Sequence, residues 1–273
     1  MAFTPLVQYK GKNDGRGPSP SIWADLPRDI QDFNVGVYFE DDFVTIPSRL
    51  TNTAEAAIGE TGQYEGFASD GATVVGASDG GGAVTLTPGN AGDEAVSLRV
   101  GGAPFKINST SYKFWFEARV KVSLITDDQS GWFIGLRENT AATVVLPILA
   151  DDTLAVGENL LGFWRNSADG DALDVVSGPN NSAVPSTVIA DAHTLVADTY
   201  VKVGMKFDPK DGKLRYFFDG VEHATTTTVT AGTGATQPDD VFLGPIIAGL
   251  CESGSPGTAT LDWWRAAQLS IDS

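Results

Sequence analysis

Cysteine and histidine are scarce in this chain, which has one cysteine and two histidines among 273 residues. A single cysteine, Cys251, excludes an internal disulfide framework. It stands in the apolar run FLGPIIAGLC, where a buried thiol is expected. Neither His193 nor His223 stands in a nucleophile motif, and so few His and Cys residues disfavour a zinc site. The sequence therefore predicts neither zinc nor a catalytic histidine.

Positive charge and long apolar runs are also scarce. The chain carries 18 Lys and Arg residues against 35 Asp and Glu residues, a formal net charge of −17 at pH 7. Binding to phosphate backbones requires clustered basic side chains, so we expect no nucleic-acid partner. No segment approaches the ~20 apolar residues of a membrane span, so we expect no membrane partner. The N-terminus, MAFTPLVQYKGKNDG, lacks the pattern of a signal peptide, and none is expected.

The first 34 residues differ from the rest of the chain, because they are rich in proline and glycine and show no period of 2 or 3.6. Such a segment is predicted to be an extended arm with one short helical turn after Pro27. The arm still carries apolar side chains that a spacer would not need: Phe3, Leu6, Val7, Tyr9, Ile22 and Trp23. These anchors can pack on their own domain or on another chain, and we favour a partner-binding arm.

From Val35 onward the sequence alternates as β-strands do. Residues 112–122, YKFWFEARVKV, place Tyr, Phe, Ala and Val on one face and Lys, Trp, Glu and Arg on the other. Residues 201–207 alternate in the same way. The pairs Asp211-Gly212 and Asp219-Gly220 each suit a tight turn, so a three-stranded antiparallel meander is predicted at this place.

Many antiparallel strands with aromatic side chains need a second sheet to close their core. We therefore predict an all-β fold, a two-sheet antiparallel jelly-roll sandwich, over residues 35–273. The extended N-terminal arm occupies residues 1–34.

Four stretches in this order resemble the concanavalin A-like jelly rolls: FWFEARVKV, GWFIGL, YVKVGMKFDPKDGKLRYFFDG and LDWWRAAQLS. That superfamily includes glycoside hydrolase family 16 laminarinases, laminin G-like modules and legume-type lectins. Similar domains also occur in structural proteins of tailed bacteriophages, such as capsid decoration or cement proteins. The resemblance implies a fold more than an activity, because folds of this kind host many functions.

A laminarinase-like activity would require two carboxylates ~5–5.5 Å apart. The resemblance implies a Glu-x-Asp-x-x-Glu type pattern on the strand after GWFIGL. Residues 150–176 contain Glu158 and no second glutamate at the required spacing. Catalysis by paired carboxylates cannot proceed with one of them missing, so we predict that the protein is not an enzyme and has no catalytic residues.

Calcium is the one candidate cofactor. The stretch SADGDALD places Asp169, Asp171 and Asp174 in one loop, and carboxylate oxygens suit calcium. An ordinary acidic turn is the alternative. The resemblance adds Asp262, at a position where laminarinase-like proteins often have an aspartate near a structural calcium.

Two tryptophans are candidates for glycan binding by ring stacking. Trp115 lies on the polar face of its predicted strand, and Trp164 lies in a strand near a turn. Acidic and polar neighbours would orient sugar hydroxyls. The alternative for both residues is the sandwich core, where aromatic side chains are common.

Three functions remain open. We favour a non-enzymatic virion structural protein, a bacteriophage capsid decoration or cement protein that forms a homo-oligomer and binds capsid or other virion proteins. It would be assembled in the host cytoplasm and stabilise the shell through its arm and sandwich. An acidic surface suits the outside of a shell, because a protein lining packaged DNA would gain from basic charge. The alternatives are a carbohydrate-binding adhesin or fibre component and a divergent glycoside hydrolase.

Overall fold

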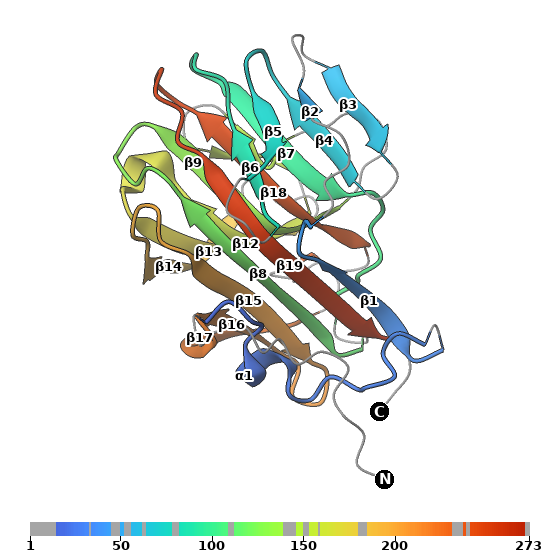
Figure 1. The fold of residues 1–273 in the computed structure, drawn as a ribbon. Helices are drawn as coiled ribbons and strands as arrows, with labels where there is room; N and C mark the ends of the chain where they lie inside the picture. Colours follow the sequence, from blue (N-terminus) through green and yellow to red (C-terminus); the bar gives the residue numbers. More distant parts are fainter. Residues whose placement is uncertain are drawn as a thin grey trace.

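Two antiparallel sheets pack face to face, with a two-stranded hairpin and two short helical segments outside them (Figure 1). This computed structural model describes residues 15–32, 34–44, 50–51, 56–61, 64–77, 82–108, 112–138, 146–149, 153–157, 159–179, 185–230, 237–238 and 241–270. The predicted all-β, two-sheet sandwich is confirmed. Among the described residues, no helix has the length and apolar character needed to cross a membrane.

The nine-stranded sheet has the order β17-β16-β15-β8-β19-β6-β5-β2, and β1 pairs with β19 beside this path. Its strands are β1 (Gly36–Asp41), β2 (Leu50–Thr51), β5 (Thr73–Gly76), β6 (Val84–Thr87), β8 (Phe114–Val122), β15 (Val201–Asp208), β16 (Lys213–Phe218), β17 (Val221–Thr228) and β19 (Ala259–Leu269).

The eight-stranded sheet has the order β14-β13-β12-β9-β18-β7-β4-β3. Its strands are β3 (Ala56–Thr61), β4 (Tyr64–Ala68), β7 (Glu94–Val100), β9 (Ser130–Glu138), β12 (Leu160–Arg165), β13 (Ala172–Gly178), β14 (Ser186–Thr194) and β18 (Leu243–Cys251). Outside both sheets lie the hairpin β10 (Ile148–Leu149) and β11 (Thr153–Leu154), the helix α1 (Pro20–Trp23) and the 3-10 turn η1 (Ser167–Asp169).

Strand β8 shows how the sequence builds the core. Alternate side chains such as Phe114 and Phe116 are buried between the sheets, as a period of 2 predicts. Tyr112, which we expected on the same face, precedes the strand and packs on its outer side instead. Strands β15, β16 and β17 form the predicted meander, and Gly212 and Gly220 provide the positive φ angles of its turns.

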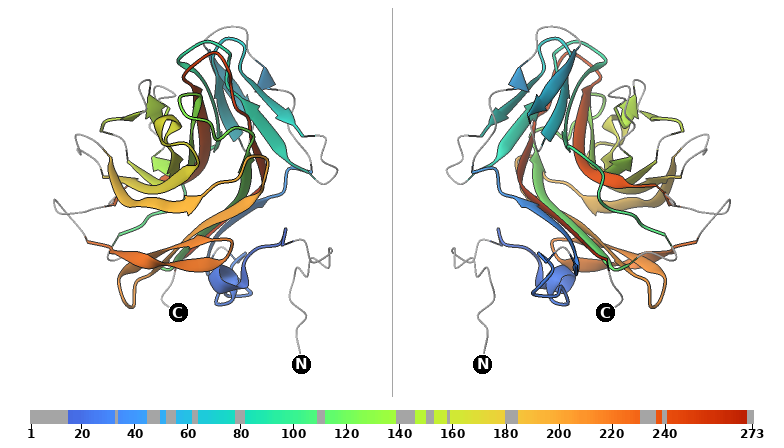
Figure 2. Two further views of the ribbon diagram at one scale, coloured as in Figure 1. Left: turned by 90° about the vertical axis from the view of Figure 1, so that its left-hand side faces the viewer. Right: turned by 90° about the vertical axis from the view of Figure 1, so that its right-hand side faces the viewer.

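Residues 15–32, which we name the N-terminal cover, lie on the outer face of the nine-stranded sheet (Figures 1 and 2). The helix α1 begins at a proline, whose fixed φ suits the first helical turn. It buries Ile22 in a cluster with Trp115 and Phe217 of the sheet. The described part of the predicted arm is therefore packed on its own domain.

The prediction that Ile22 binds a partner is wrong, because its side chain is fully buried against the chain's own sheet. Partner binding by Trp23 stays a prediction. Trp23 is half-buried: its Nε1 donates to Glu117 at 2.6 Å, and its ring centroid lies 5.2 Å from Cζ of Arg265. Sequence patterns did not reveal this packing, because the segment has no period that assigns it to a face. The remaining predicted anchors lie outside the described residues: Phe3, Leu6, Val7 and Tyr9.

Candidate functional site

Each sheet carries a cover on the face that is turned away from the sandwich core. The N-terminal cover lies on the nine-stranded sheet. Residues 146–149 and 153–157, which contain β10 and β11 and which we name the hairpin cover, lie on the eight-stranded sheet (Figure 2). These two covers decide which outer-face side chains reach solvent.

A buried carboxylate of the sheet, Glu117, forms hydrogen bonds with the N-terminal cover. Its Oε2 accepts hydrogen bonds from the backbone amide of Ser19 at 3.0 Å and from Nε1 of Trp23 at 2.6 Å. Burial raises the pKa of Glu117, although the hydrogen bonds from Ser19 and Trp23 and the charge of Lys202 oppose the rise. The sheet therefore recognises the backbone of the cover as well as its side chains.

Asp25 of the N-terminal cover binds Trp115, the first candidate for glycan stacking. Its Oδ1 accepts from Nε1 of Trp115 at 3.0 Å and from Nζ of Lys206 at 2.8 Å. Trp115 is 0% exposed, so its ring offers no face to a sugar. The glycan-binding prediction for Trp115 is wrong, because the cover occupies the outer side of its strand.

Asp262, a predicted calcium ligand, also binds the N-terminal cover, through Arg16. Its Oδ2 accepts from Nε of Arg16 at 3.0 Å and from Nη1 of Arg119 at 2.5 Å. Nε1 of Trp263 donates to the carbonyl oxygen of Arg16 at 2.7 Å, which fixes the start of the cover. Two guanidinium groups hold the carboxylate of Asp262, which is apart from the acidic loop at Asp169. The calcium prediction for Asp262 is therefore wrong.

On the eight-stranded sheet, one line of paired residues crosses six strands on the outer face. We name it the cross-strand row: Phe67, Ser97, Ala248, Phe133, Trp164 and Asp174. Their sequence neighbours, such as Ile134 and Ile247, point into the sandwich core, so the row points away from it. At ~4.8 Å per strand spacing, the row is about 24 Å long.

The hairpin cover packs on this row. Ile148 and Leu154 are buried in one apolar cluster with Phe133 and Trp164. Ile148 lies over Gly131, where an added Cβ would be 3.5 Å from Cγ2 of Ile148.

Trp164, the second candidate for glycan stacking, lies under the hairpin cover and is 8% exposed. The prediction of an exposed stacking ring is therefore wrong for Trp164 too. Its Nε1 is buried and has no hydrogen-bond partner, and the same is true of Oγ of Ser97. A buried polar group left without a partner costs about 1–3 kcal/mol.

Three carboxylates meet at the Trp164 end of the row. Asp169 of η1, Asp174 of β13 and Asp191 of β14 place oxygen atoms within 4.8 Å of one another. The β13–β14 pairing shifts register next to Asp174, and Asp191 has a φ of 50°, so its amide donates to Oδ1 of Asp174 at 2.9 Å. Asp171 is not in this group, which corrects the prediction for that residue. Sequence spacing missed Asp191 because a β-bulge brings it in.

The electrostatics of this acidic group are set by burial and by like charges. Burial raises the pKa of Asp174, and the charges of Asp169 and Asp191 raise it further, while the Asp191 amide opposes the rise. Carboxylate oxygens so placed accept hydrogen bonds from hydroxyl groups and also suit a hard cation such as calcium. Calcium binding at Asp169 and Asp174 stays a prediction.

The outer-face positions of the neighbouring strands β9 and β12 do not carry the hydrolase pattern. The outward residues of β9 and β12 are Gly131, Phe133, Gly135, Arg137, Leu160, Gly162 and Trp164. None of these is a carboxylate. Glu158, the glutamate noted in the sequence, lies outside the described residues.

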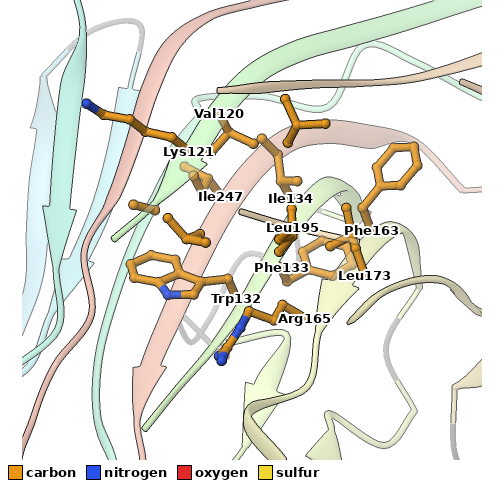
Figure 3. A pocket seen from close by; sticks show the side chains of 13 residues that line it. Val120, Lys121, Trp132, Phe133, Ile134, Phe163, Arg165, Leu173, Leu195 and Ile247 are labelled. Carbon is orange, nitrogen blue, oxygen red and sulfur yellow. The ribbon is translucent and has the colours of Figure 1, made fainter. Parts of the chain in front are cut away.

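A small cavity lies between the sheets (Figure 3). It has a volume of about 30 Å³ and is lined by apolar side chains such as Val120 and Phe163. Lys121 contributes its stem, and its ammonium group points away. Pockets for small molecules measure about 300 Å³ or more, so this cavity is a packing space and not a ligand site.

The chain matches no protein-family model and no curated protein sequence. It is similar in structure to peanut lectin with a 9mer peptide, at TM-score 0.56 and 15% identity, over 87% of this chain and 99% of that chain. The carbohydrate recognition domain of Emp46p in its potassium-bound form aligns at TM-score 0.52 and 12% identity, over 80% and 95%. Arcelin-5, a lectin-like defense protein from Phaseolus vulgaris, aligns at TM-score 0.51 and 9% identity, over 85% and 97%. The chain therefore has the concanavalin A-like lectin/glucanase jelly-roll fold.

Proposed function

We propose that this chain is a non-enzymatic carbohydrate-binding domain with its ligand on the outer face of the eight-stranded sheet. The observation that carries the proposal is the position of Trp164 directly opposite Asp174 on the neighbouring strand, at the acidic end of the cross-strand row. An indole N–H and several carboxylate oxygens supply the donors and acceptors that sugar hydroxyls require. The likeness in fold to a lectin and to a carbohydrate recognition domain supports the choice of ligand class.

A glycan array probed with the full chain tests this function. We expect binding to at least one saccharide and weaker binding by Asp174→Asn, which removes a hydroxyl acceptor. Asp29→Asn, an equal charge change at an exposed residue of the N-terminal cover, is the control. Running the array in calcium and in EGTA asks whether the acidic group acts through a cation. Absence of binding in both conditions would contradict the proposal.

The favoured sequence hypothesis, a decoration or cement protein of a bacteriophage virion, is a second candidate. The anchoring of Arg16 and Ser19 favours it, because a partner bound by the preceding residues would be joined to the sandwich through this cover. In this proposal those residues, with Phe3, Leu6, Val7 and Tyr9, bind capsid proteins. A homo-oligomer that binds glycans fits such a role as well.

Deleting residues 1–14 separates this role from folding, because the deletion stops before the N-terminal cover. We expect lost cosedimentation with undecorated tailed-phage shells and an unchanged thermal melt. Shell binding that survives the deletion, or that the full chain never shows, would count against the virion role.

A further inference from the structure

Two polar groups on the outer face of the eight-stranded sheet are buried and have no partner in the described structure. Nε1 of Trp164 and Oγ of Ser97 are both buried and unpartnered. Both belong to the cross-strand row, and the residues between them, Ala248 and Phe133, are apolar. Unpaired polar groups at two ends of an apolar strip suit a ligand with hydroxyl groups and apolar ring faces.

The dimensions of this strip suit a short linear oligosaccharide. Ser97 and Trp164 are three strand spacings apart, which is about 14 Å. The row contains no basic side chain, and Asp174 follows Trp164 at its end. A negatively charged sugar would be repelled there, so a neutral saccharide is the matching class.

One side of the hairpin cover packs on the sheet and its other side is exposed. Ile148 and Leu154 meet the sheet through apolar packing, whereas Val156 on the same segment is 59% exposed. A ligand that reaches Trp164 would compete with these two side chains, because they pack on the Phe133–Trp164 part of the row.

We propose that the hairpin cover moves aside to open a subsite for a neutral, linear oligosaccharide along the cross-strand row. Nε1 of Trp164 and Oγ of Ser97 are the hydrogen-bonding groups of this subsite. The inference rests on the proposed carbohydrate-binding function and names the subsite and the segment that closes it.

The test weakens the cover and measures binding of cellotriose, laminaritriose and maltotriose by calorimetry. The double variant Ile148→Ser with Leu154→Ser is expected to bind one of them about fivefold more tightly than the wild type, because closure no longer competes with the ligand. Val156→Ser, on the exposed side of the same segment, is the control and leaves affinity unchanged. Equal affinity of the double variant and the wild type would overturn the proposal.

Two further variants, made in the cover-weakened chain, test the named groups. Trp164→Phe keeps an apolar ring but removes the N–H, and Ser97→Ala removes the hydroxyl. Each is expected to lower affinity about fivefold, as the loss of one hydrogen bond does. If the double variant does not fold, hydrogen exchange of residues 146–149 and 153–157 in the wild type replaces it. Faster exchange with saturating trisaccharide supports the proposal, and unchanged exchange overturns it.

These outcomes separate the subsite from the proposed function. A chain that binds glycans, loses affinity with Asp174→Asn and keeps it with Trp164→Phe and Ser97→Ala overturns the subsite alone. A chain that binds no glycan in any variant overturns both.

Discussion

The two outer faces of this sandwich each bury a tryptophan, but by different means. Over the nine-stranded sheet, Asp25 of the N-terminal cover accepts the indole N–H of Trp115 at 3.0 Å. Over the eight-stranded sheet, the hairpin cover packs on Trp164 and leaves its indole N–H without a partner. The same residue type is thus part of a hydrogen-bonded contact on one face and incompletely paired on the other.

The difference assigns the covers different roles. The N-terminal cover is joined to its sheet by ion pairs and hydrogen bonds at three carboxylates: Glu117, Asp25 and Asp262. It completes the domain. The hairpin cover offers apolar packing to a strip that also contains unpaired polar atoms. We propose that a ligand reaches the sheet on the face that the hairpin cover occupies.

The largest expected effect is at Ile22 of the N-terminal cover, which is fully buried against the nine-stranded sheet. Ile22→Ala should lower the free energy of unfolding by about 2–4 kcal/mol, because it leaves a cavity in a cluster that belongs to the folded domain. Urea denaturation measures the change. Val221→Ala, at an exposed side chain, should change it by less than about 0.5 kcal/mol. A small loss for Ile22→Ala would show that the N-terminal cover is not part of the cooperative fold.

A smaller effect is expected at Leu154, although it is also buried. Leu154→Ala should cost about 1 kcal/mol or less, because a substitution in a segment that opens locally cannot cost more than the free energy that docks the segment. The same denaturation series measures it. A loss equal to that of Ile22→Ala would remove the distinction between the two covers.

The smallest expected effect is a pH dependence at Glu117. Burial raises the pKa of this carboxyl above its ordinary value of 4.5, so the folded state binds the proton more tightly than the unfolded state. The unfolding free energy of the wild type should therefore fall, relative to Glu117→Gln, as pH rises from 4.5 through the raised pKa, and stay level above it. Urea titrations at several pH values test the sign. A difference that grows in favour of the wild type with rising pH would contradict it.

Alternation in the sequence predicted the sandwich and the inner faces of its strands, because a strand's period of 2 is a local property. Phe114 and Phe116 were placed correctly for that reason. The burial of Trp115 was missed, because its cover comes from the N-terminal segment, far from it in the sequence. Periodicity separates two faces of a strand but does not show whether a distant segment covers the outer one.

The candidate site was only partly predictable for the same reason. Asp169 and Asp174 are close in sequence and were found by spacing. Asp191 reaches them through a β-bulge, and Arg16 reaches Asp262 across the whole length of the chain. Neither contact can be predicted from the residues next to it in the sequence. The pairing of Trp164 with Asp174 depends on strand register, which a single strand does not reveal.

Hydrogen exchange read by mass spectrometry tests the difference between the covers most directly. We expect residues 146–149 and 153–157 to exchange through local opening and faster than residues 15–32. The protection of residues 15–32 should approach that of β8, the strand beneath them. Equal protection of the two covers, or faster exchange of residues 15–32, would contradict the central claim that one cover completes the fold and the other opens to a ligand.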